Sequence, residues 1–150
     1  MNASDAIKRS ISHDEIVTLD SATAEDVAAL NHLSDDSADN TAYGISEFWG
    51  TTEDGDEWRV HVRGDTDEIV AKHSRKLARQ LFNDDMSRAD EVPMCTDGKR
   101  AFRRWVDAAS NAGDRETYAA LEAVDSDVFA AEWDRCVNEA ALYAGHGGAG

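Results

Sequence analysis

Acidic side chains are the residues of this sequence with the clearest chemical potential. They form two groups along the chain: Asp35, Asp36 and Asp39, then Glu53, Asp54, Asp56 and Glu57. Grouped carboxylates can hold a cation, and carboxylates spread over a surface can imitate the phosphates of DNA. The first group does not fit a calcium-binding loop, because its sixth position is Asn40 where glycine is needed and its twelfth is Ser46 rather than glutamate. Both groups are therefore candidates for an acidic binding surface, and we expect no metal there.

Basic side chains gather in the middle of the chain. They are Lys72, Arg75, Lys76, Arg79, Lys99, Arg100, Arg103 and Arg104. Clustered Lys and Arg beside aromatic residues such as Phe102 and Trp105 can form a phosphate-binding patch. However, a chain of net charge -16 repels a nucleic-acid backbone, and these two aromatic residues have the spacing of core positions. We expect the bases to pair with acidic segments of this protein or of a partner, and we expect no direct nucleic-acid binding.

Signatures of metal binding and nucleophilic catalysis are weak. The two cysteines, Cys95 and Cys136, have no CxxC spacing, and the five histidines include no HExxH pair. His73 falls on an apolar helical stripe, which favours a hydrogen-bonded core histidine. The chain also has no GxSxG, P-loop or GxGxxG motif. We therefore expect a non-enzymatic protein with no catalytic residues and no cofactor.

The composition of the whole chain points to its environment. Its 150 residues include 31 Asp and Glu against 15 Lys and Arg, with more Asp than Glu and more Arg than Lys. Short hydrated carboxylates and weakly hydrated guanidinium groups suit concentrated salt, where the Debye length falls to roughly 3 Å at 1 M. In this respect the chain resembles proteins of salt-accumulating archaea and their viruses, although no motif connects it to a family. Salt adaptation and acidity kept for a binding target both explain these acids.

The first half of the chain predicts a small sheet with helices. Ile16, Val17 and Leu19 predict a short strand, and Thr23 with Asp26 resembles a capping box at the start of a helix over residues 23–38.

A hairpin near residues 43–63 is the clearest element. Trp58, Val60 and Val62 alternate with polar residues, and Asp54-Gly55 is a typical turn. Trp49 and Trp58 are expected to pair across its two strands.

The second half predicts helices only. Apolar residues recur at helical spacing over 66–82 and again over 99–111, where Gly113 ends the helix. The stretch 83–98 holds the single proline and predicts a loop. Two further apolar stripes lie on either side of 125–127, which is typical of a break and a new N-cap.

Together these elements predict an α+β fold with a small antiparallel sheet of about three strands, four or five helices on one face, and an all-helical C-terminal half. We expect a flexible N-terminal arm at 1–12, a single domain at 13–144 and a flexible glycine-rich tail at 145–150. No apolar run reaches the roughly 18 residues of a membrane span, and the N-terminus lacks a secretory signal. We expect a soluble protein that is cytoplasmic or virion-associated.

The functional expectation is an interaction, structural or accessory protein of a halophilic archaeon, its virus or a mobile element. It would act through protein contacts, including self-association. The first alternative is a DNA mimic that inhibits a nucleic-acid-binding defence complex, of the anti-restriction or anti-CRISPR type, through the two acidic groups. The second alternative is an enzyme without a recognisable motif.

Overall fold

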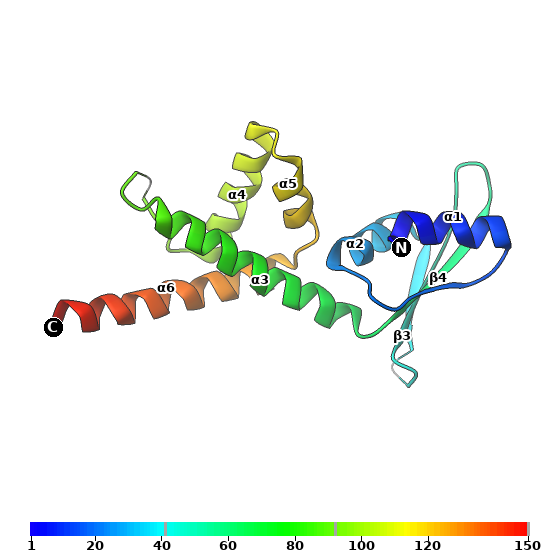
Figure 1. Cartoon of the computed structure of the whole chain (residues 1–150), viewed down its shortest axis with the longest axis horizontal. Helices are drawn as coiled ribbons and strands as arrows, with labels where there is room; N and C mark the ends of the chain where they lie inside the picture. The colour runs from blue at the N-terminus through cyan, green and yellow to red at the C-terminus, as the bar shows by residue number, and fades with distance from the viewer. Residues whose placement is uncertain (41, 92, 150) are drawn as a thin grey trace. The chain divides into compact units, whose positions relative to one another are not determined.

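A computed structural model describes residues 1–40, 42–91 and 93–149, with side chains as far as Tyr143. The chain divides into two compact units, Met1–Val70 (unit 1) and Ala71–Gly150 (unit 2), as Figure 1 shows. Unit 1 holds α1 (Ala3–His13), β1 (Val17–Leu19), α2 (Ala24–Leu33), β2 (Asp36–Asn40), β3 (Ile45–Thr51), β4 (Glu57–Arg63) and the start of α3 (Thr66–Ser87). Unit 2 holds the rest of α3, then α4 (Gly98–Ala112), α5 (Arg115–Glu122) and α6 (Ser126–Ala149). The α+β class and the helical C-terminal half are confirmed.

Unit 1 is built on a mixed four-stranded sheet with the strand order β1-β4-β3-β2. Strand β3 pairs antiparallel with β2 and β4, whereas β1 runs parallel to β4 with Val17 opposite Val60. Residues of α1, of α2 and of the inner face of the sheet, where Phe48, Trp58 and Val60 point, form one hydrophobic core. The sheet therefore has one more strand than expected, and one of its pairs is parallel rather than antiparallel.

The first residues form helix α1 where the sequence suggested a flexible arm at 1–12. The Asn2 side chain caps this helix by accepting a hydrogen bond from the Asp5 backbone N–H at 2.8 Å. Ala3, Ala6 and Ile7 are buried in the core of unit 1. The helix was not predicted because alanine contributes little to an apolar periodicity in the sequence. In the structure, the small side chains of Ala3 and Ala6 allow the helix to pack closely on the sheet.

Helix α2 begins at the predicted capping box. The Thr23 hydroxyl oxygen accepts from the Asp26 backbone N–H, and the Asp26 carboxylate accepts from the Thr23 backbone N–H at 2.9 Å. The same carboxylate accepts from the Ala3 backbone N–H at 2.9 Å, which ties the start of α1 to the start of α2. The helix ends at Leu33, before the predicted end at residue 38.

The acidic residues after α2 form edge strand β2 rather than the predicted acidic helix end. Asp, Ser and Asn have low helix propensity, because their side chains form hydrogen bonds with nearby backbone groups. Ser37 illustrates this, since its backbone N–H donates to the Asp36 carboxylate at 2.8 Å. Strand β3 then supplies the pairing edge, with Asp36 opposite Trp49 and Asn40 opposite Ile45.

The hairpin of β3 and β4 is confirmed, and it turns at Gly55 with φ of 88°. The expected Trp49–Trp58 pair is wrong, because Trp49 lies opposite Arg59 and Trp58 lies opposite Gly50. An offset of one residue places two side chains on opposite faces of a sheet. Trp58 therefore fills the core over Gly50, where a Cβ atom would lie 2.8 Å from the indole ring. Trp49 is left on the outer face.

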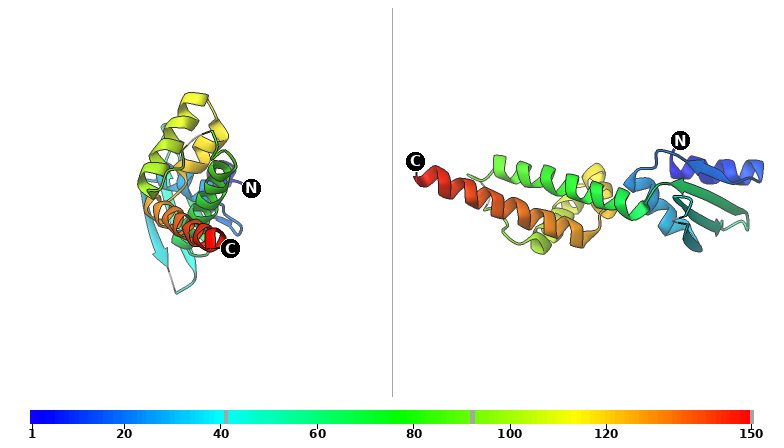
Figure 2. Two further views of the ribbon diagram at one scale, coloured as in Figure 1. Left: turned by 90° about the vertical axis from the view of Figure 1, so that its left-hand side faces the viewer. Right: turned by 90° about the horizontal axis from the view of Figure 1, so that it is seen from below.

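Unit 2 packs its helices around Trp133, which has no exposed surface. Figure 2 shows α3 and α6 side by side in this unit. The Trp133 indole N–H donates to the Cys95 carbonyl at 2.8 Å. The Trp133 ring lies edge-on to the Phe82 ring, with 5.4 Å between the ring centroids, and stacks on the Phe129 ring, with 6.0 Å between the centroids. Helix α3 continues to Ser87, beyond the predicted end at 82, so the predicted loop is shorter.

Helices α4 and α6 approach closely at Gly98. A Cβ atom added to Gly98 would lie 2.6 Å from the Cα atom of Ala130, and the Gly98 backbone N–H donates to the Asp134 carboxylate at 2.8 Å. The predicted ends are confirmed: Gly113 ends α4 with φ of 67°, and the Asp125 carboxylate caps the start of α6.

The sequence predicted one domain over 13–144, whereas the structure has two units with separate cores and a boundary inside α3. The predicted tail at 145–150 also differs, because the backbone of α6 continues to Ala149. The side chains of that segment and Gly150 lie outside the described residues. No helix in the described part of the chain is long and apolar enough to cross a membrane.

Candidate interaction site

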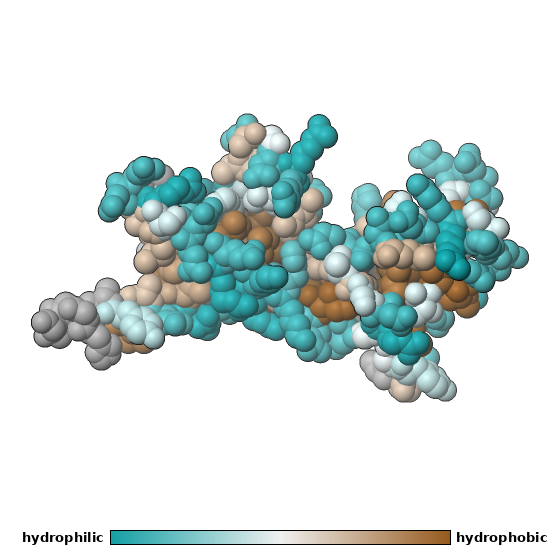
Figure 3. Space-filling model, in the orientation of Figure 1, coloured by the Kyte–Doolittle hydropathy of each residue, from teal (hydrophilic) through white to brown (hydrophobic). Residues whose placement is uncertain are grey.

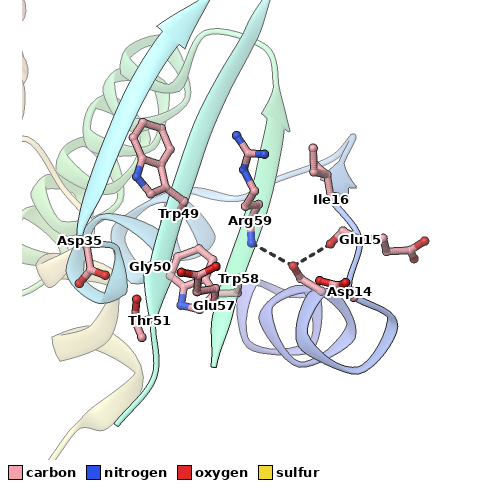
Figure 4. Close-up of a pocket in the computed structure, with 11 residues that line it drawn as sticks. Asp14, Glu15, Ile16, Asp35, Trp49, Gly50, Thr51, Glu57, Trp58 and Arg59 are labelled. Atoms are coloured by element: carbon pink, nitrogen blue, oxygen red, sulfur yellow. Dashed lines mark hydrogen bonds between the residues drawn. The ribbon is translucent and has the colours of Figure 1, made fainter. Parts of the chain in front are cut away.

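A cavity of about 500 Å³ lies in unit 1 at the end of the sheet where the hairpin turns. Residues from α1, from the segments before β1 and β2, and from both hairpin strands line it: Ser10, Asp14, Glu15, Ile16, Asp35, Trp49, Gly50, Thr51, Glu57, Trp58 and Arg59. Figure 4 shows these side chains around the ends of the strands. We call this cavity the acidic pocket.

Hydrogen bonds to the backbone hold the acidic pocket together. The Ser10 hydroxyl donates to the Glu15 carbonyl at 2.7 Å and accepts from the Arg59 backbone N–H at 2.9 Å, as the dashed lines of Figure 4 show. On the opposite side, the Asp35 backbone N–H donates to the Trp49 carbonyl at 2.9 Å. The pocket is therefore fixed by the Ser10 hydroxyl, which joins α1 to β4 on one side, and by a backbone bond to β3 on the other.

The lining of the acidic pocket carries four carboxylates and one guanidinium group. The carboxylates are those of Asp14, Glu15, Asp35 and Glu57, and the guanidinium is that of Arg59. Trp49 adds a partly buried aromatic surface, and Ile16 is 44% exposed. Trp49 lies opposite Arg59 on the outer face of the sheet, and its ring points away from the carboxylates in Figure 4. A negatively charged cavity suits a cationic group, which gains from the carboxylates.

The rest of the outer face of the sheet satisfies its own charges. Arg63 pairs with Asp20 at 2.8 Å, and His61 lies 3.3 Å from Glu47 across the strands. In the acidic pocket, Glu15 pairs with Arg9 at 3.7 Å. Among the described residues, Asp14, Asp35 and Glu57 form no ion pair, and neither does Arg59. The hairpin end thus has three unpaired carboxylates against one unpaired guanidinium group.

The structure brings together only some of the predicted acidic residues. Asp35 and Glu57 both line the acidic pocket. Asp36 lies next to it in register with Trp49, while Asp39 lies farther along β2 and accepts a hydrogen bond from the Ser46 hydroxyl at 2.7 Å. The remaining predicted acids, Glu53, Asp54 and Asp56, lie in the hairpin turn and outside the pocket lining.

Sequence reasoning missed Asp14, Glu15 and the role of Trp49. The two acids precede a predicted strand, but their approach to Glu57 depends on the parallel pairing of β1 with β4. That pairing joins segments about forty residues apart, for which the sequence has no local signal. The position of Trp49 could have been predicted from the alternation of side chains in the hairpin, because with Trp58 facing the core the register places Trp49 on the opposite face.

The predicted basic residues divide between two helices of unit 2. Arg79 pairs with Glu132 of α6 at 3.4 Å, and Arg104 pairs with Asp85 of α3. A depression of about 430 Å³ along α4 is lined by Asp97, Lys99, Arg100, Arg103, Arg104 and Asp107. All of these belong to α4 and its cap, so the α3 bases Lys72, Arg75, Lys76 and Arg79 do not contribute to it.

Other predicted candidates have structural positions. His73 Nε2 donates to the Ala120 carbonyl at 2.9 Å, which confirms a hydrogen-bonded packing role. Cys95 and Cys136 are both buried and both free, and burial raises the pKa of the Cys136 thiol. Among the described residues, no group of three or more His, Cys, Asp or Glu side chains has the geometry to hold a metal ion.

Glu132 is one of two buried carboxylates described in unit 2, with Asp85, and Arg135 donates to it at 2.6 Å. Hydrogen bonding from Arg135 holds the pKa of Glu132 below its usual value of 4.5. A lowered folded-state pKa means that this pair stabilises the protein above about pH 4.5 and that the contribution is lost as pH falls further.

We expect Glu132→Gln to lower the stability of unit 2 by about 1–2 kcal/mol at pH 7, because it replaces charged hydrogen bonds with neutral ones. The difference from the unchanged protein should shrink as pH falls from 6 to 3, which urea unfolding followed by circular dichroism would measure. Parallel stability curves for the two proteins would contradict this assignment.

Comparison with protein-family models, with curated proteins and with solved structures finds no match to this chain.

Proposed function

We propose that this protein is a non-enzymatic interaction module whose acidic pocket binds a basic segment of a protein partner. The observation that supports this proposal is the combination of four carboxylates and Trp49 around one cavity of about 500 Å³. Such a cavity has room for one long cationic side chain and its neighbours. Much of the molecular face in Figure 3 is hydrophilic, with apolar areas between the hydrophilic ones.

Arginine is the side chain that suits this pocket best. Its planar guanidinium can donate to carboxylates such as Asp35 and Glu57, and on entering from the outer face of the sheet it would meet Trp49. A cation over an indole contributes about 0.5–2 kcal/mol, and exposed ion pairs add less each. Binding of this kind weakens as salt screens the carboxylates.

The proposal is tested by titrating a short arginine-rich peptide into the protein and following fluorescence anisotropy at about 0.1 M salt. We expect Trp49→Ala to weaken binding about tenfold, which corresponds to about 1.4 kcal/mol. The pocket double variant Asp35→Asn with Glu57→Gln should weaken it by a similar factor.

The matched control is Asp54→Asn with Asp56→Asn, which removes the same charge from the hairpin turn outside the pocket lining. It should leave peptide affinity nearly unchanged. Equal losses in the two double variants would show that general negative charge, and not the pocket, attracts the peptide, and would contradict the proposal.

The DNA-mimic alternative is supported by a different observation. Asp35, Asp36 and the turn acids all lie at the hairpin end of the sheet, where they could face a basic groove. This function requires the whole array of carboxylates, so both double variants should then lose inhibition of a DNA-binding target equally.

The acid-rich composition supports a host that accumulates salt. Within such a host we propose a cytoplasmic or virion-associated protein.

A further inference from the structure

The outer face of α4 carries basic side chains that the protein compensates only in part: the backbone N–H groups of Arg100 and Lys99, and then their positive charges, help to lower the pKa of Asp97 at the start of the helix. Lys99, Arg100 and Arg103 are exposed, and within the part of the chain that the structure describes they form no salt bridge. This is unexpected in a chain with 31 acids and 15 bases, where a carboxylate is easily found. By contrast, Arg104 on the same helix pairs with Asp85, and Arg135 on α6 pairs with Glu132 and Glu139.

Helical spacing places the unpaired bases together. Arg103 lies three positions after Arg100 and four after Lys99, and residues at these spacings are neighbours on a helix surface. Ala101 and Ala109 are buried on the other side of α4. Asp97 caps the start of this helix by accepting from the backbone N–H groups of Lys99 and Arg100 at 2.9 and 3.1 Å. The basic face is therefore held on a well-formed helix.

The acids that could complement this face are concentrated in unit 1. Unit 1 contains 17 acids and 4 bases, a net charge of -13, whereas unit 2 contains 14 acids and 11 bases, a net charge of -3. The acidic pocket of unit 1 and the basic face of α4 thus have opposite local charge. Among the described residues, three carboxylates of the pocket (Asp14, Asp35 and Glu57) and the three bases of the α4 face form no salt bridge, while Glu15 pairs with Arg9.

We propose that the ligand of the acidic pocket is the basic face of α4 from a second copy of this chain. Arg100 or Arg103 would enter the pocket beside Trp49, and Lys99 would lie against the acids at its rim. This inference rests on the proposed function, because it names the partner of the same pocket. The contact joins two different surfaces, so repetition gives a ring or an open chain of molecules.

Salt sets the conditions under which this contact forms. Two chains of net charge -16 repel each other in dilute buffer, where the Debye length is about 30 Å at 0.01 M. Near 0.15 M the length is about 8 Å, so distant acids are screened while charges in direct contact still attract. Self-association should therefore peak at intermediate salt and weaken again above about 1 M.

A nucleic acid is the less favoured ligand of the α4 face. Asp97 and Asp107 flank the depression, and the chain as a whole repels a phosphate backbone. An acidic surface on a folded protein can be shaped to avoid these two carboxylates, whereas a regular phosphate backbone cannot.

Sedimentation velocity over a concentration series from about 10 to 500 µM tests the inference, because assembly follows mass action. The unchanged protein should form dimers and larger species at about 0.15 M salt. Arg100→Glu with Arg103→Glu should weaken association at least about tenfold. Lys76→Glu with Arg115→Glu makes the same change of charge elsewhere in unit 2 and should have little effect.

Mixing two variants, each defective in one of the two surfaces, is the decisive experiment. The α4 variant keeps an intact pocket, and Asp35→Lys with Glu57→Lys keeps an intact α4 face. Each alone should stay monomeric, but the mixture should form a heterodimer, because one intact pocket meets one intact α4 face. Recovery of that dimer supports a contact between these two surfaces.

Three outcomes would overturn the inference. An unchanged protein that stays monomeric at every concentration and salt has no such contact. Equal losses in the α4 variant and in its charge control show general electrostatics. Binding of a labelled oligonucleotide by a monomeric protein, lost in the α4 variant, assigns the α4 face to nucleic acid. In each case the arginine-peptide titration still decides the proposed function separately.

Discussion

Replacing Gly98 by alanine should unfold unit 2. The added Cβ would lie 2.6 Å from the Cα atom and 2.7 Å from the carbonyl carbon of Ala130, and it would overlap the carbonyl oxygen of that residue. These are backbone atoms, which cannot move aside as the end of a side chain can. Helices α4 and α6 would have to separate, and separation would also break the bond from the Gly98 N–H to Asp134. We expect a loss of about 3 kcal/mol or more.

Hydrogen exchange followed by mass spectrometry would locate this loss, because amides of α4 and α6 should lose protection. Lys99→Ala is the matched control, since Lys99 is the next residue and its side chain is exposed. It should change stability by less than about 0.5 kcal/mol. A stable Gly98→Ala protein with protected α4 and α6 amides would mean that the two helices do not approach as closely as described.

Truncating Trp133 should have a comparable effect for a different reason. Trp133→Ala removes a fully buried side chain, leaves a cavity between Phe82 and Phe129, and leaves the Cys95 carbonyl without its donor. Loss of a core tryptophan costs about 3–5 kcal/mol. That is a large part of the stability of a small unit, so we expect unit 2 to be mostly unfolded at room temperature.

Trp105→Phe is the informative comparison for Trp133→Ala. The indole N–H of Trp105 is buried and has no hydrogen-bond partner among the described residues. Phenylalanine removes that unsatisfied donor and keeps an aromatic ring near Arg88, so the change should be nearly neutral. Urea unfolding followed by circular dichroism measures both variants. Similar losses in the two proteins would contradict the central position assigned to Trp133.

These predictions bear on function through the two-unit organisation. The pocket belongs to unit 1 and the α4 face to unit 2, and the two units have separate cores. A variant that unfolds unit 2 should therefore lose self-association through the α4 face. Trp49 lies outside both cores, so changes there test ligand binding with little effect on folding.

The sequence by itself determined the local features of this protein. Thr23 with Asp26 marked the start of α2, Gly113 marked the end of α4, and the alternation ending at Val62 marked the hairpin. Each signal lies within a few residues of chain, where capping bonds, left-handed glycines and side-chain alternation act. The net charge of -16 and its uneven distribution were also readable directly.

Tertiary structure alone decided the features that depend on distant partners. Helix α1 has few large apolar residues and is held by the sheet that it covers, and β2 has a turn-forming sequence that is paired because β3 offers an edge. The parallel pairing of β1 with β4 brings Asp14 and Glu15 to Glu57 and so creates the acidic pocket. Such contacts gain their free energy only when remote segments meet, so no single stretch of sequence encodes them.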